Sequence, residues 1–323
     1  MSHPLDFSVV ICAYTDERWD DLVAAVASVT CQSLPPHEII IVIDHNPALL
    51  ERVRAHLPQV VAVENSAARG LGGARNSGVA AAHGAIIAFL DDDAIAAPDW
   101  LEQLQAAFHN NDVLGVGGAI EPMWLDGQPV WFPTEFNWVI GASYRGMPET
   151  ITPVRNLFGC NMAFRREVFA TLGGFRLGYG CDETEFCIRA RQHWPEKVLL
   201  YNPQAKVQHK VPASRGRWRY FRTRCYFEGR SKAVVSWLVG RQAGLASERS
   251  YTLRTLPGGI LRGLADAVLA KDHAGLARAT AILAGLAITT AGYLTGTLSV
   301  EQAARERGWS EPSQRVITGG IGE

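Results

Sequence analysis

The sequence predicts an α/β fold whose central sheet is largely parallel and has helices on both faces. Continuous apolar runs alternate with helix-patterned segments through the first third of the chain. This alternation is typical of parallel strands that are buried on both faces. Polar residues follow several of the runs: Tyr14, Asp16, Asp44 and Asp91–Asp93. Ligands bind beyond the carboxyl ends of such strands, so these positions predict a binding site.

The runs and the segments between them give the expected elements in order. Strands are expected where β-branched and other apolar residues are continuous, over 7–14, 37–46, 60–65 and 85–93. Helices are expected where apolar residues recur at helical spacing, over 18–32, 49–57 and 98–108. The glycine-rich stretch 70–84 is expected to be a loop that enters a helix.

The second half of the chain has a different character. Residues 115–122, 131–146 and 154–175 are rich in aromatic residues, glycine and asparagine, which predicts strands and loops closing over a site. A helix is expected over 178–194 and a strand over 197–207. From about Arg249 the pattern is helical.

Size and composition allow one large α/β domain with an appendage. The chain has 323 residues, of which 47 % are hydrophobic and 20 % are charged, so it can bury a substantial core. We expect a catalytic domain over 1–215, a basic and apolar helical extension over 216–300, and a flexible tail over 301–323. The extension is a candidate for contact with a membrane.

Charge is unevenly distributed, although the net charge of −1 gives no indication of a nucleic-acid partner. The stretch Lys206–Lys232 has many lysines and arginines and one acid, Glu228. It predicts contact with a phosphate or an anionic membrane surface, or else a solvated helix face. Residues 279–300 have no charge. They predict a helix hairpin that lies on a membrane or packs on the domain, or else a buried core helix.

The cysteines and the N-terminal residues indicate the cellular compartment of the protein. The 6 cysteines form no Cys-x-x-Cys pair, which argues against a zinc site and a disulfide framework and fits a reducing cytosol. The first residues, MSHPLDFSVVICAY, have no basic region followed by an apolar one, so no signal peptide is expected. The predicted location is the cytoplasm, including the cytoplasmic face of a membrane.

The run of three aspartates, Asp91 to Asp93, needs positive charge nearby because neighbouring carboxylates repel each other. On an extended strand, Asp91 and Asp93 would point to the same side. Two carboxylates at a strand end suit a hard divalent cation such as Mg²⁺ or Mn²⁺. An acidic surface turn is the alternative interpretation.

Three further sequence features are candidate functional groups, although each one alone is weak evidence of function. Arg75, in the glycine-rich stretch, offers a guanidinium for a phosphate. Asp182 and Glu183 crowd at an expected helix start, where the helix dipole favours acids, and either could also act as a general base. His209 follows a strand-like segment and is a candidate metal ligand, although a lone histidine is more often structural.

Taken together and in order, these motifs resemble the family 2 glycosyltransferases, enzymes of the GT-A fold. The resemblance covers about Phe7 to Arg191 and extends through VQHKVP. It rests on these segments: VVICAYTDER, EIIIVIDHN, GGARNSG, AFLDDDA, NMAFRREVFATLGGF and GCDETEFCIRARQ. WFPTEFNWVIGASYRG and FEGRSKA further resemble a subgroup acting on lipid-linked glycans, the glucosyl-dolichyl phosphate glucuronosyltransferase-like enzymes. The implied fold is a mixed sheet with helices on both faces, followed by a C-terminal helical extension.

The resemblance implies roles around a nucleotide-sugar donor. Ala13, Tyr14 and Asp16 would surround the nucleotide, and Asp44 would hydrogen-bond its base, usually uracil. Arg75 would lie near the diphosphate.

The acidic motif has its own implied roles. Asp91 would contact the ribose or the metal, with Asp92 beside it. Asp93 would ligate Mn²⁺ or Mg²⁺ in an Asp-x-Asp motif, and His209 would complete the metal shell.

The resemblance also implies a catalytic base, and the sequence departs from the family pattern at two further motifs. Glu183 would be the base, with Asp182 as the alternative because the family's Glu-Asp order is reversed. Ile43 to Asn46 replaces the usual Asp-Asp-Gly-Ser, which weakens the uracil inference. The Gln-x-x-Arg-Trp of processive members is absent, which favours transfer of one sugar per acceptor.

The implied reaction is direct displacement at the anomeric carbon with inversion of configuration. A divalent cation would offset charge on the departing diphosphate, and the base would take the proton of an acceptor hydroxyl. The donor would be a nucleotide-diphosphate sugar, with UDP favoured, and the acceptor a glycan or a lipid-linked glycan. The alternatives are a sugar-nucleotide nucleotidyltransferase and a non-catalytic nucleotide-sugar-binding protein.

Overall fold

The structure is a computed structural model, and it describes residues 5–108, 110–176, 182–240 and 251–306. The chain divides into two compact units. Unit 1 comprises 1–121, 148–178 and 182–210, and unit 2 comprises 122–147, 179–181 and 211–323. Segment 122–147 therefore belongs with the C-terminal helices, although it interrupts unit 1 in the sequence.

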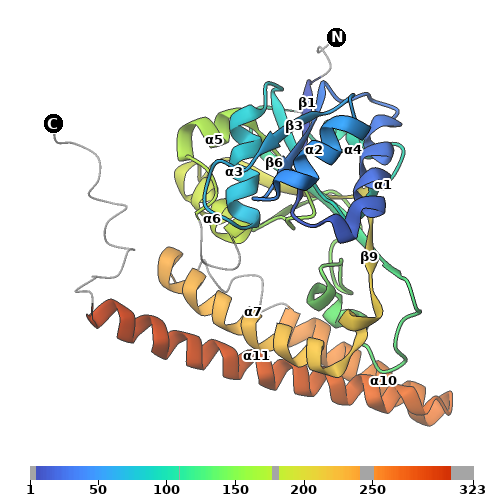
Figure 1. The fold of residues 1–323 in the computed structure, drawn as a ribbon. Coiled ribbons are helices and arrows are strands. Elements are labelled where there is room, and N and C mark those ends of the chain that lie inside the picture. The colour runs from blue at the N-terminus through green and yellow to red at the C-terminus, as the bar shows by residue number, and fades with distance from the viewer. Residues whose placement is uncertain (1–4, 109, 177–181, 241–250, 307–323) are drawn as a thin grey trace. The chain divides into compact units, whose positions relative to one another are not determined.

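A nine-stranded mixed sheet forms the centre of unit 1 (Figure 1). Its strands are β1 (Phe7–Ala13), β2 (Glu38–Ile43), β3 (Val61–Glu64), β4 (Ile86–Asp91), β5 (Ala94–Ala96), β6 (Val113–Trp124), β7 (Thr152–Val154), β8 (Asn161–Arg165) and β9 (Val198–Val211). Their order is β3-β2-β1-β4-β8-β6-β9-β5, and β7 pairs with β9. The first four strands in this order are parallel, whereas β8 is antiparallel to both β4 and β6. The predicted mixed sheet is confirmed.

Helices connect the strands of unit 1. They are η1 (Asp16–Arg18), α1 (Trp19–Thr30), α2 (Pro47–His56), α3 (Leu71–Ala81), α4 (Trp100–Ala107), α5 (Arg166–Leu172) and α6 (Asp182–His193). On one face of the sheet, Val10, Ile40 and Phe89 pack in one cluster with residues of α3, α5 and α6. Phe89 lies edge-on to Phe169, which stacks on Phe186 with ring centroids 4.7 Å apart. This aromatic core fixes α6, which begins at the predicted catalytic pair.

One local prediction about the site region was wrong, and a second is corrected in its boundary. The strand β4 ends at Asp91, and Asp92 and Asp93 form a turn before β5, so strand alternation does not orient the aspartates. The glycine-rich stretch is mostly helical, because α3 begins at Leu71. A side chain at Gly78 would clash with Val10, so this glycine allows close packing of α3 on the sheet and does not approach a ligand.

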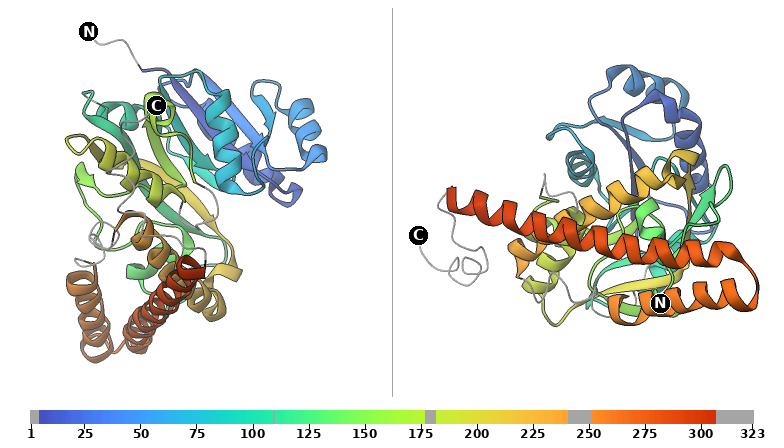
Figure 2. Two further views of the ribbon diagram at one scale, coloured as in Figure 1. Left: turned by 90° about the vertical axis from the view of Figure 1, so that its left-hand side faces the viewer. Right: turned by 90° about the horizontal axis from the view of Figure 1, so that it is seen from below.

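Unit 2 is helical. It contains η2 (Thr134–Ile140), η3 (Ala213–Gly216), α7 (Trp218–Val239), η4 (Tyr251–Thr255), α10 (Leu256–Leu269) and α11 (His273–Glu306). The helices α7 and α10 both pack on α11 (Figure 2). Side chains at Gly229 or Gly292 would clash with the backbone of the facing helix, and Gly263 and Gly275 meet in the same way between α10 and α11. Glycines therefore bring these backbones close together.

The C-terminal helix α11 extends farther than the sequence suggests. At 1.5 Å per residue, its 34 residues are about 50 Å long. It continues through Glu306, into the range predicted to be a tail, and residues 307–323 lie outside the described residues. Among the described residues, His273–Gln302 is the one segment long and apolar enough to cross a membrane. The division into a catalytic domain over 1–215, an extension over 216–300 and a tail over 301–323 stays a prediction.

Close contact between β6 and β9 is open to a stability test. A side chain at Gly118 of β6 would overlap the backbone carbonyl of Ala205 in β9. We expect Gly118→Ala to lower the free energy of unfolding by about 1–3 kcal/mol, because the strands must separate to admit a methyl group. Urea denaturation measures this change. Ala119→Ser adds one atom on the opposite face of β6 and serves as the control. A Gly118→Ala midpoint equal to that of the wild type would contradict the close contact.

Candidate active site

The carboxyl end of β4 lies beside a histidine of β9. In the antiparallel pairing of β5 with β9, Ala94 lies opposite His209, and the amide of Lys210 donates to the carbonyl of Asp93. His209 Nε2 lies 3.2 Å from Asp93 Oδ1. One ligand atom each of Asp91, Asp93 and His209 lie within 4.8 Å of one another. The structure thus brings His209 next to Asp91 and Asp93, from which it is far apart in the sequence.

These three side chains fit a divalent cation of the Mn²⁺ or Mg²⁺ class. Two carboxylate oxygens and one imidazole nitrogen are ligands that Mn²⁺ accepts, and Mg²⁺ prefers the oxygens. Asp93 and His209 are buried, at 6 % and 3 % exposed, so they can hold fixed positions. A site of this kind has few protein ligands and leaves positions for substrate oxygens.

Arg18, which sequence reasoning missed, compensates the same acidic turn. Its Nη1 lies 3.0 Å from Asp92 Oδ1 and 3.2 Å from Asp93 Oδ2. Arg18 ends the short helix η1, directly before α1. Its place in YTDER, after the first strand, was the only available signal.

Asp92 has a raised pKa. Burial raises its pKa to about 6, and the neighbouring Asp93 and Asp91 add to the effect, although Arg18 opposes it. The Oδ2 atom of Asp92 is buried and has no hydrogen-bond partner among the described residues. The side chain of Asp92 therefore lies inward, toward Arg18, and is separate from the Asp91–Asp93–His209 group.

Arg75 connects the aspartates to the predicted base. It is 4 % exposed, its Nη2 lies 3.5 Å from Asp91 Oδ1, and its Nη1 lies 3.8 Å from Glu183 Oε2. Its guanidinium packs against Gly159, where a side chain would clash with it. Arg75 thus holds acids from β4 and α6 at one edge of the sheet.

The two predicted base candidates begin α6. The helix starts at Asp182 and has Asp182, Glu183 and Glu185 in its first turn. Glu185 is fully buried and pairs with Arg189, at 2.9 Å, and with Arg176. Glu185 thus has a structural role, whereas Glu183 contacts Arg75.

Asp44 organises the turn between β3 and α3. Its Oδ1 accepts a hydrogen bond from Asn65 Nδ2 at 2.7 Å, and its Oδ2 accepts one from the amide of Gly70 at 2.9 Å. Partial burial raises the pKa of Asp44, but the hydrogen bonds from Asn65, His45 and Gly70 outweigh this effect and lower it. Gly70 has a φ of 119°, a conformation that favours glycine. These hydrogen-bond partners of Asp44 could not be predicted from local sequence patterns.

The remaining predicted nucleotide residues lie at the end of β1. Ala13 is buried and its carbonyl accepts from the amide of Asp44. Tyr14 is 57 % exposed, and the guanidinium of Arg18 lies 5.7 Å from its ring centre. Asp16 accepts from Asn46 Nδ2 at 3.3 Å. These residues share the sheet edge with Asp44 and the aspartate turn.

Asn161, another residue that sequence reasoning did not single out, positions the histidine strand. It is fully buried, donates to the carbonyls of Ala119 in β6 and Ala205 in β9, and accepts from Trp100 Nε1 at 2.8 Å. It connects three strands with α4. Its place in NMAFRR, one of the recognised motifs, was the available signal.

Two solved glycosyltransferase structures share this architecture. The mannosyltransferase PcManGT from Pyrobaculum calidifontis, solved with GDP-Man and Mn²⁺, superimposes with a TM-score of 0.56 at 16 % identity, over 91 % of this chain and 88 % of that one. GalNAc-T7, solved with UDP, GalNAc and Mn²⁺, gives 0.53 at 19 % identity, over 78 % of this chain and 52 % of that one. The fold is therefore the GT-A fold.

The sequence comparisons define the family. Residues 8–173 match the model of glycosyl transferase family 2. The glucosyl-dolichyl phosphate glucuronosyltransferase of Haloferax volcanii is 36 % identical over 243 residues, which are 72 % of this chain and 77 % of the relative. Succinoglycan biosynthesis protein ExoM of Rhizobium meliloti is 25 % identical over 239 residues, covering 70 % of this chain and 74 % of the relative. The chain belongs to glycosyltransferase family 2, and the protein is a glycosyltransferase.

The contact between Arg18 and the aspartates leads to a prediction about metal affinity. Because the guanidinium occupies oxygens of Asp92 and Asp93, Arg18→Gln removes a competing cation. We expect Mn²⁺ to bind about fivefold more tightly, a change of roughly 1 kcal/mol. Calorimetric titration of the purified protein with Mn²⁺ measures this. Arg52→Gln, which removes a surface partner of Asp16, is the matched control. Weaker Mn²⁺ binding by Arg18→Gln would show instead that Arg18 is needed to shape the site.

Proposed function

We propose that the protein is a metal-dependent, inverting glycosyltransferase that moves one sugar from a nucleotide-diphosphate sugar to a hydroxyl of a glycan or lipid-linked acceptor. One observation carries this proposal: the Asp91–Asp93–His209 group lies next to Arg75, which also contacts Glu183. A cation site and a candidate base are thereby adjacent in one unit. Family membership favours glycosyl transfer over nucleotidyl transfer and over binding without catalysis.

The donor would bind along the edge formed by β1, β2 and β4. Ala13, Tyr14 and Asp16 would surround the nucleotide, and Asp44 would accept a hydrogen bond from the base. A carboxylate has about four lone-pair sites, and Asp44 already hydrogen-bonds Asn65, His45 and Gly70, so one site is left for a further donor. UDP is the nucleotide that we favour, because the relative from Haloferax volcanii is named as a glucuronosyltransferase and GalNAc-T7 was solved with UDP.

Asp91, Asp93 and His209 would hold Mn²⁺ or Mg²⁺, with Asp92 and Arg18 behind them. The bound ion supplies positive charge beside the donor diphosphate, whose oxygens become more negative as the sugar leaves. Arg75 is buried 3.5 Å from Asp91 and adds a fixed positive charge at the same edge. Because it is held in place, it needs little reorganisation during the reaction.

Glu183 would accept the proton of the acceptor hydroxyl, with Asp182 as the alternative. An acceptor hydroxyl loses its proton as it attacks the anomeric carbon, so a carboxylate must lie on the acceptor side. Attack on the side opposite the diphosphate inverts the configuration. Arg75 contacts both Asp91 and Glu183, which keeps the base at a fixed position relative to the metal group.

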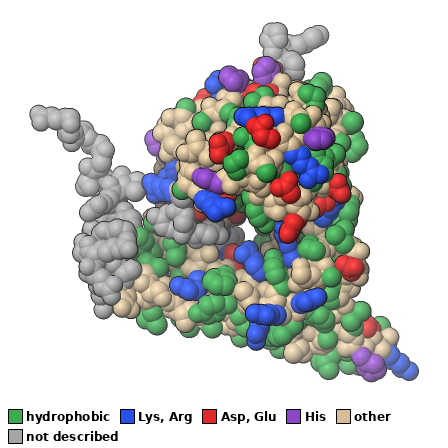
Figure 3. All heavy atoms as spheres, viewed as in Figure 1, with side chains coloured by type: hydrophobic (Ala, Val, Ile, Leu, Met, Phe, Trp, Pro, Cys, Tyr) green, Lys and Arg blue, Asp and Glu red, His purple; other side chains and the backbone are tan. Residues whose placement is uncertain are grey.

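Unit 2 would bring the enzyme to the cytoplasmic face of a membrane through residues 216–300. The helix α11 packs on α7 and α10 with one side, and its opposite side exposes Leu276, Leu283, Leu294 and Leu298. These leucines are separated by nearly whole numbers of helical turns and so form one stripe, and all of them except Leu276 lie in the uncharged segment 279–300. Hydrophobic side chains and scattered lysines and arginines lie along the face of the helices in Figure 3. An uncharged exposed stripe suits an interfacial helix, with the arginines of α7 available for anionic lipid heads.

A panel of nucleotide sugars tests the reaction. We expect the purified protein to release UDP from one donor in the presence of Mn²⁺ or Mg²⁺ and an acceptor glycan or lipid-linked glycan, and to lose this activity with chelator. Asp93→Asn should abolish turnover, and Glu183→Gln should reduce kcat by about 10²–10⁴-fold while donor binding persists. Glu196→Gln, which changes an exposed carboxylate outside the site, is the control.

Two results would contradict this proposal. Full activity with the metal chelated would exclude metal dependence, and release of pyrophosphate would indicate nucleotidyl transfer. If Asp182→Asn, in place of Glu183→Gln, removes activity, the base is Asp182.

The leucine stripe makes a separate prediction. We expect Leu283→Glu with Leu294→Glu to reduce co-sedimentation with anionic lipid vesicles at least about tenfold, because two apolar side chains lose their burial in lipid. Val61→Glu with Ile151→Glu makes the same change at two exposed apolar positions of unit 1 and should have little effect. Equal sedimentation of the wild type and the α11 double variant would rule out α11 as the membrane contact.

A further inference from the structure

His45 has a backbone conformation that favours glycine. It lies in the turn between β2 and α2, where its φ is 54°. Among the described residues, the other non-glycine residue with a positive φ is Lys271. A histidine in this left-handed region is strained, whereas a glycine is not. The family pattern Asp-Asp-Gly-Ser, which Ile43 to Asn46 replaces, has its glycine at this position. The chain therefore has an imidazole at a position where glycine would relieve the strain.

Contacts on both sides of the turn fix this conformation. The amide of Asp44 donates to the carbonyl of Ala13 at 2.8 Å, which holds the end of β2 beside β1. Asn46 caps α2 by accepting from the amide of Leu49 at 3.1 Å. Strained residues persist where their surroundings determine the backbone, and they are concentrated at functional sites. The neighbours of His45 thus set the turn, and its side chain is left for another role.

The imidazole of His45 contacts the carboxylate that we assign to the nucleotide base. Its Nδ1 lies 2.8 Å from Asp44 Oδ1, and its side chain is 42 % exposed. The pKa of Asp44 is held below its ordinary value, so the carboxylate is ionised at neutral pH and only accepts. Nδ1 of His45 is therefore the donor. Nε2 has no hydrogen-bond partner within the described residues, and it is the ring nitrogen available to a ligand.

Asp44 and His45 together match one arrangement of groups on a base. Asp44 offers an acceptor, and an imidazole that lies between two acceptors donates from both nitrogens in its protonated form. Uracil and guanine have a ring N–H beside a carbonyl oxygen, O4 or O6, whereas cytosine and adenine have a ring acceptor beside an amino group. The first arrangement pairs with an acceptor next to a donor. The second sets donor against donor and acceptor against acceptor, which leaves these groups unpaired.

We propose that His45 is a specificity-determining residue, which donates from Nε2 to the carbonyl oxygen of a uracil or guanine base while Asp44 accepts from the neighbouring ring N–H. This inference rests on the proposed function, because it deepens the assignment of Asp44 to the nucleotide base. The pair selects uridine and guanosine diphosphates over cytidine and adenosine diphosphates, and UDP belongs to the selected class. The strained residue has a function on this account, because glycine would bring no donor to the base.

Calorimetric titration of the full-length protein with UDP, GDP, CDP and ADP, in the presence of Mn²⁺, tests this proposal without a sugar or an acceptor. We expect UDP or GDP to bind at least about tenfold more tightly than CDP and ADP. His45→Gly should weaken binding of the preferred nucleotide about tenfold and leave the weak binding of CDP and ADP unchanged. Its melting temperature should not fall, because relief of the strained φ offsets the greater freedom of glycine in the unfolded chain.

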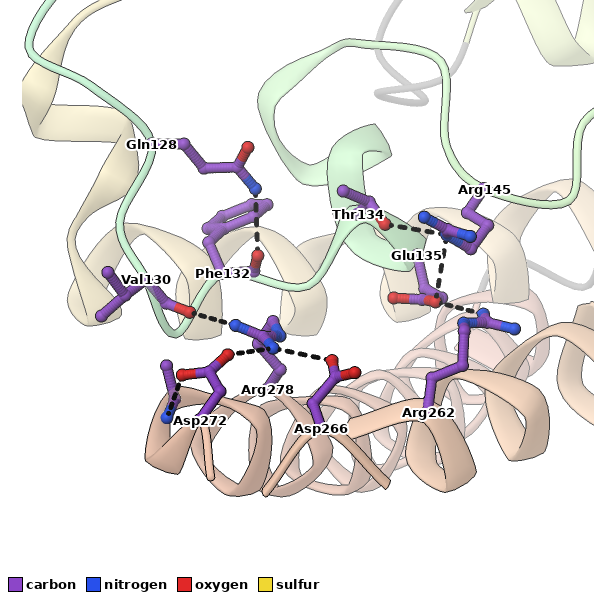
Figure 4. Close-up of polar contacts among 11 residues, drawn as sticks. Gln128, Val130, Phe132, Thr134, Glu135, Arg145, Arg262, Asp266, Asp272 and Arg278 are labelled. Atoms are coloured by element: carbon purple, nitrogen blue, oxygen red, sulfur yellow. Dashed lines mark hydrogen bonds and ion pairs between the residues drawn. The ribbon is translucent and has the colours of Figure 1, made fainter. Parts of the chain in front are cut away.

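Lys271→Gly is the matched control for backbone strain. Lys271 has the same φ of 54° in the turn between α10 and α11, where Arg278 donates to Asp266 at 2.9 Å and to Asp272 at 2.8 Å (Figure 4). It is exposed and belongs to unit 2. We expect Lys271→Gly to relieve strain as His45→Gly does, and to bind every nucleotide like the wild type.

His45→Asn is a second variant of the proposed residue. Asparagine tolerates a left-handed φ, but its side chain is too short to contact Asp44 and a base together, so the preference should fall as it does in His45→Gly. Unchanged binding of the preferred nucleotide by both variants would overturn the role of His45 and leave the proposed function in place.

Two other patterns of binding would also overturn the role of His45. An equal loss of affinity for all four nucleotides, with a lower melting temperature, would show that His45 shapes the turn and does not recognise the base. A wild-type preference for CDP or ADP would exclude the pairing with a carbonyl oxygen. Binding of none of the four nucleotides by the wild type would contradict the proposed function itself, and this inference with it.

Discussion

The structure of unit 1 depends on compensating the negative charge at the end of β4. Three consecutive aspartates repel one another, and burial of Asp92 adds to the cost of keeping it ionised. Compensation comes from Arg18 of η1 and Arg75 of α3, and His209 of β9 lies 3.2 Å from Asp93. No two of these elements are consecutive in the chain, so the charges are balanced only when the whole sheet has formed. The group that makes the site chemically useful also makes it dependent on the complete fold.

The sequence predicted the features that are local in the chain. Buried strands have continuous apolar runs, so β1, β2 and β4 and the polar residues after them could be located without a structure. Order and spacing of motifs identified Asp91, Asp93 and His209 as partners, and the structure places them together. Their convergence does not follow from strand alternation, because Asp92 and Asp93 lie in a turn. It follows from the pairing of β5 with β9, which no local pattern encodes.

Contacts between distant segments could not be predicted. Arg18 is one of several arginines in the sequence, and its role depends on how η1 approaches the aspartate turn. The hydrogen bonds of Asn65 to Asp44 and of Asn161 to β6 and β9 are likewise tertiary. The assignment of 122–147 to unit 2 likewise depends on tertiary contacts and could not be predicted from the sequence. Its aromatic residues looked like part of a closing loop, but Phe136 packs on Phe221 of α7, with ring centroids 5.2 Å apart.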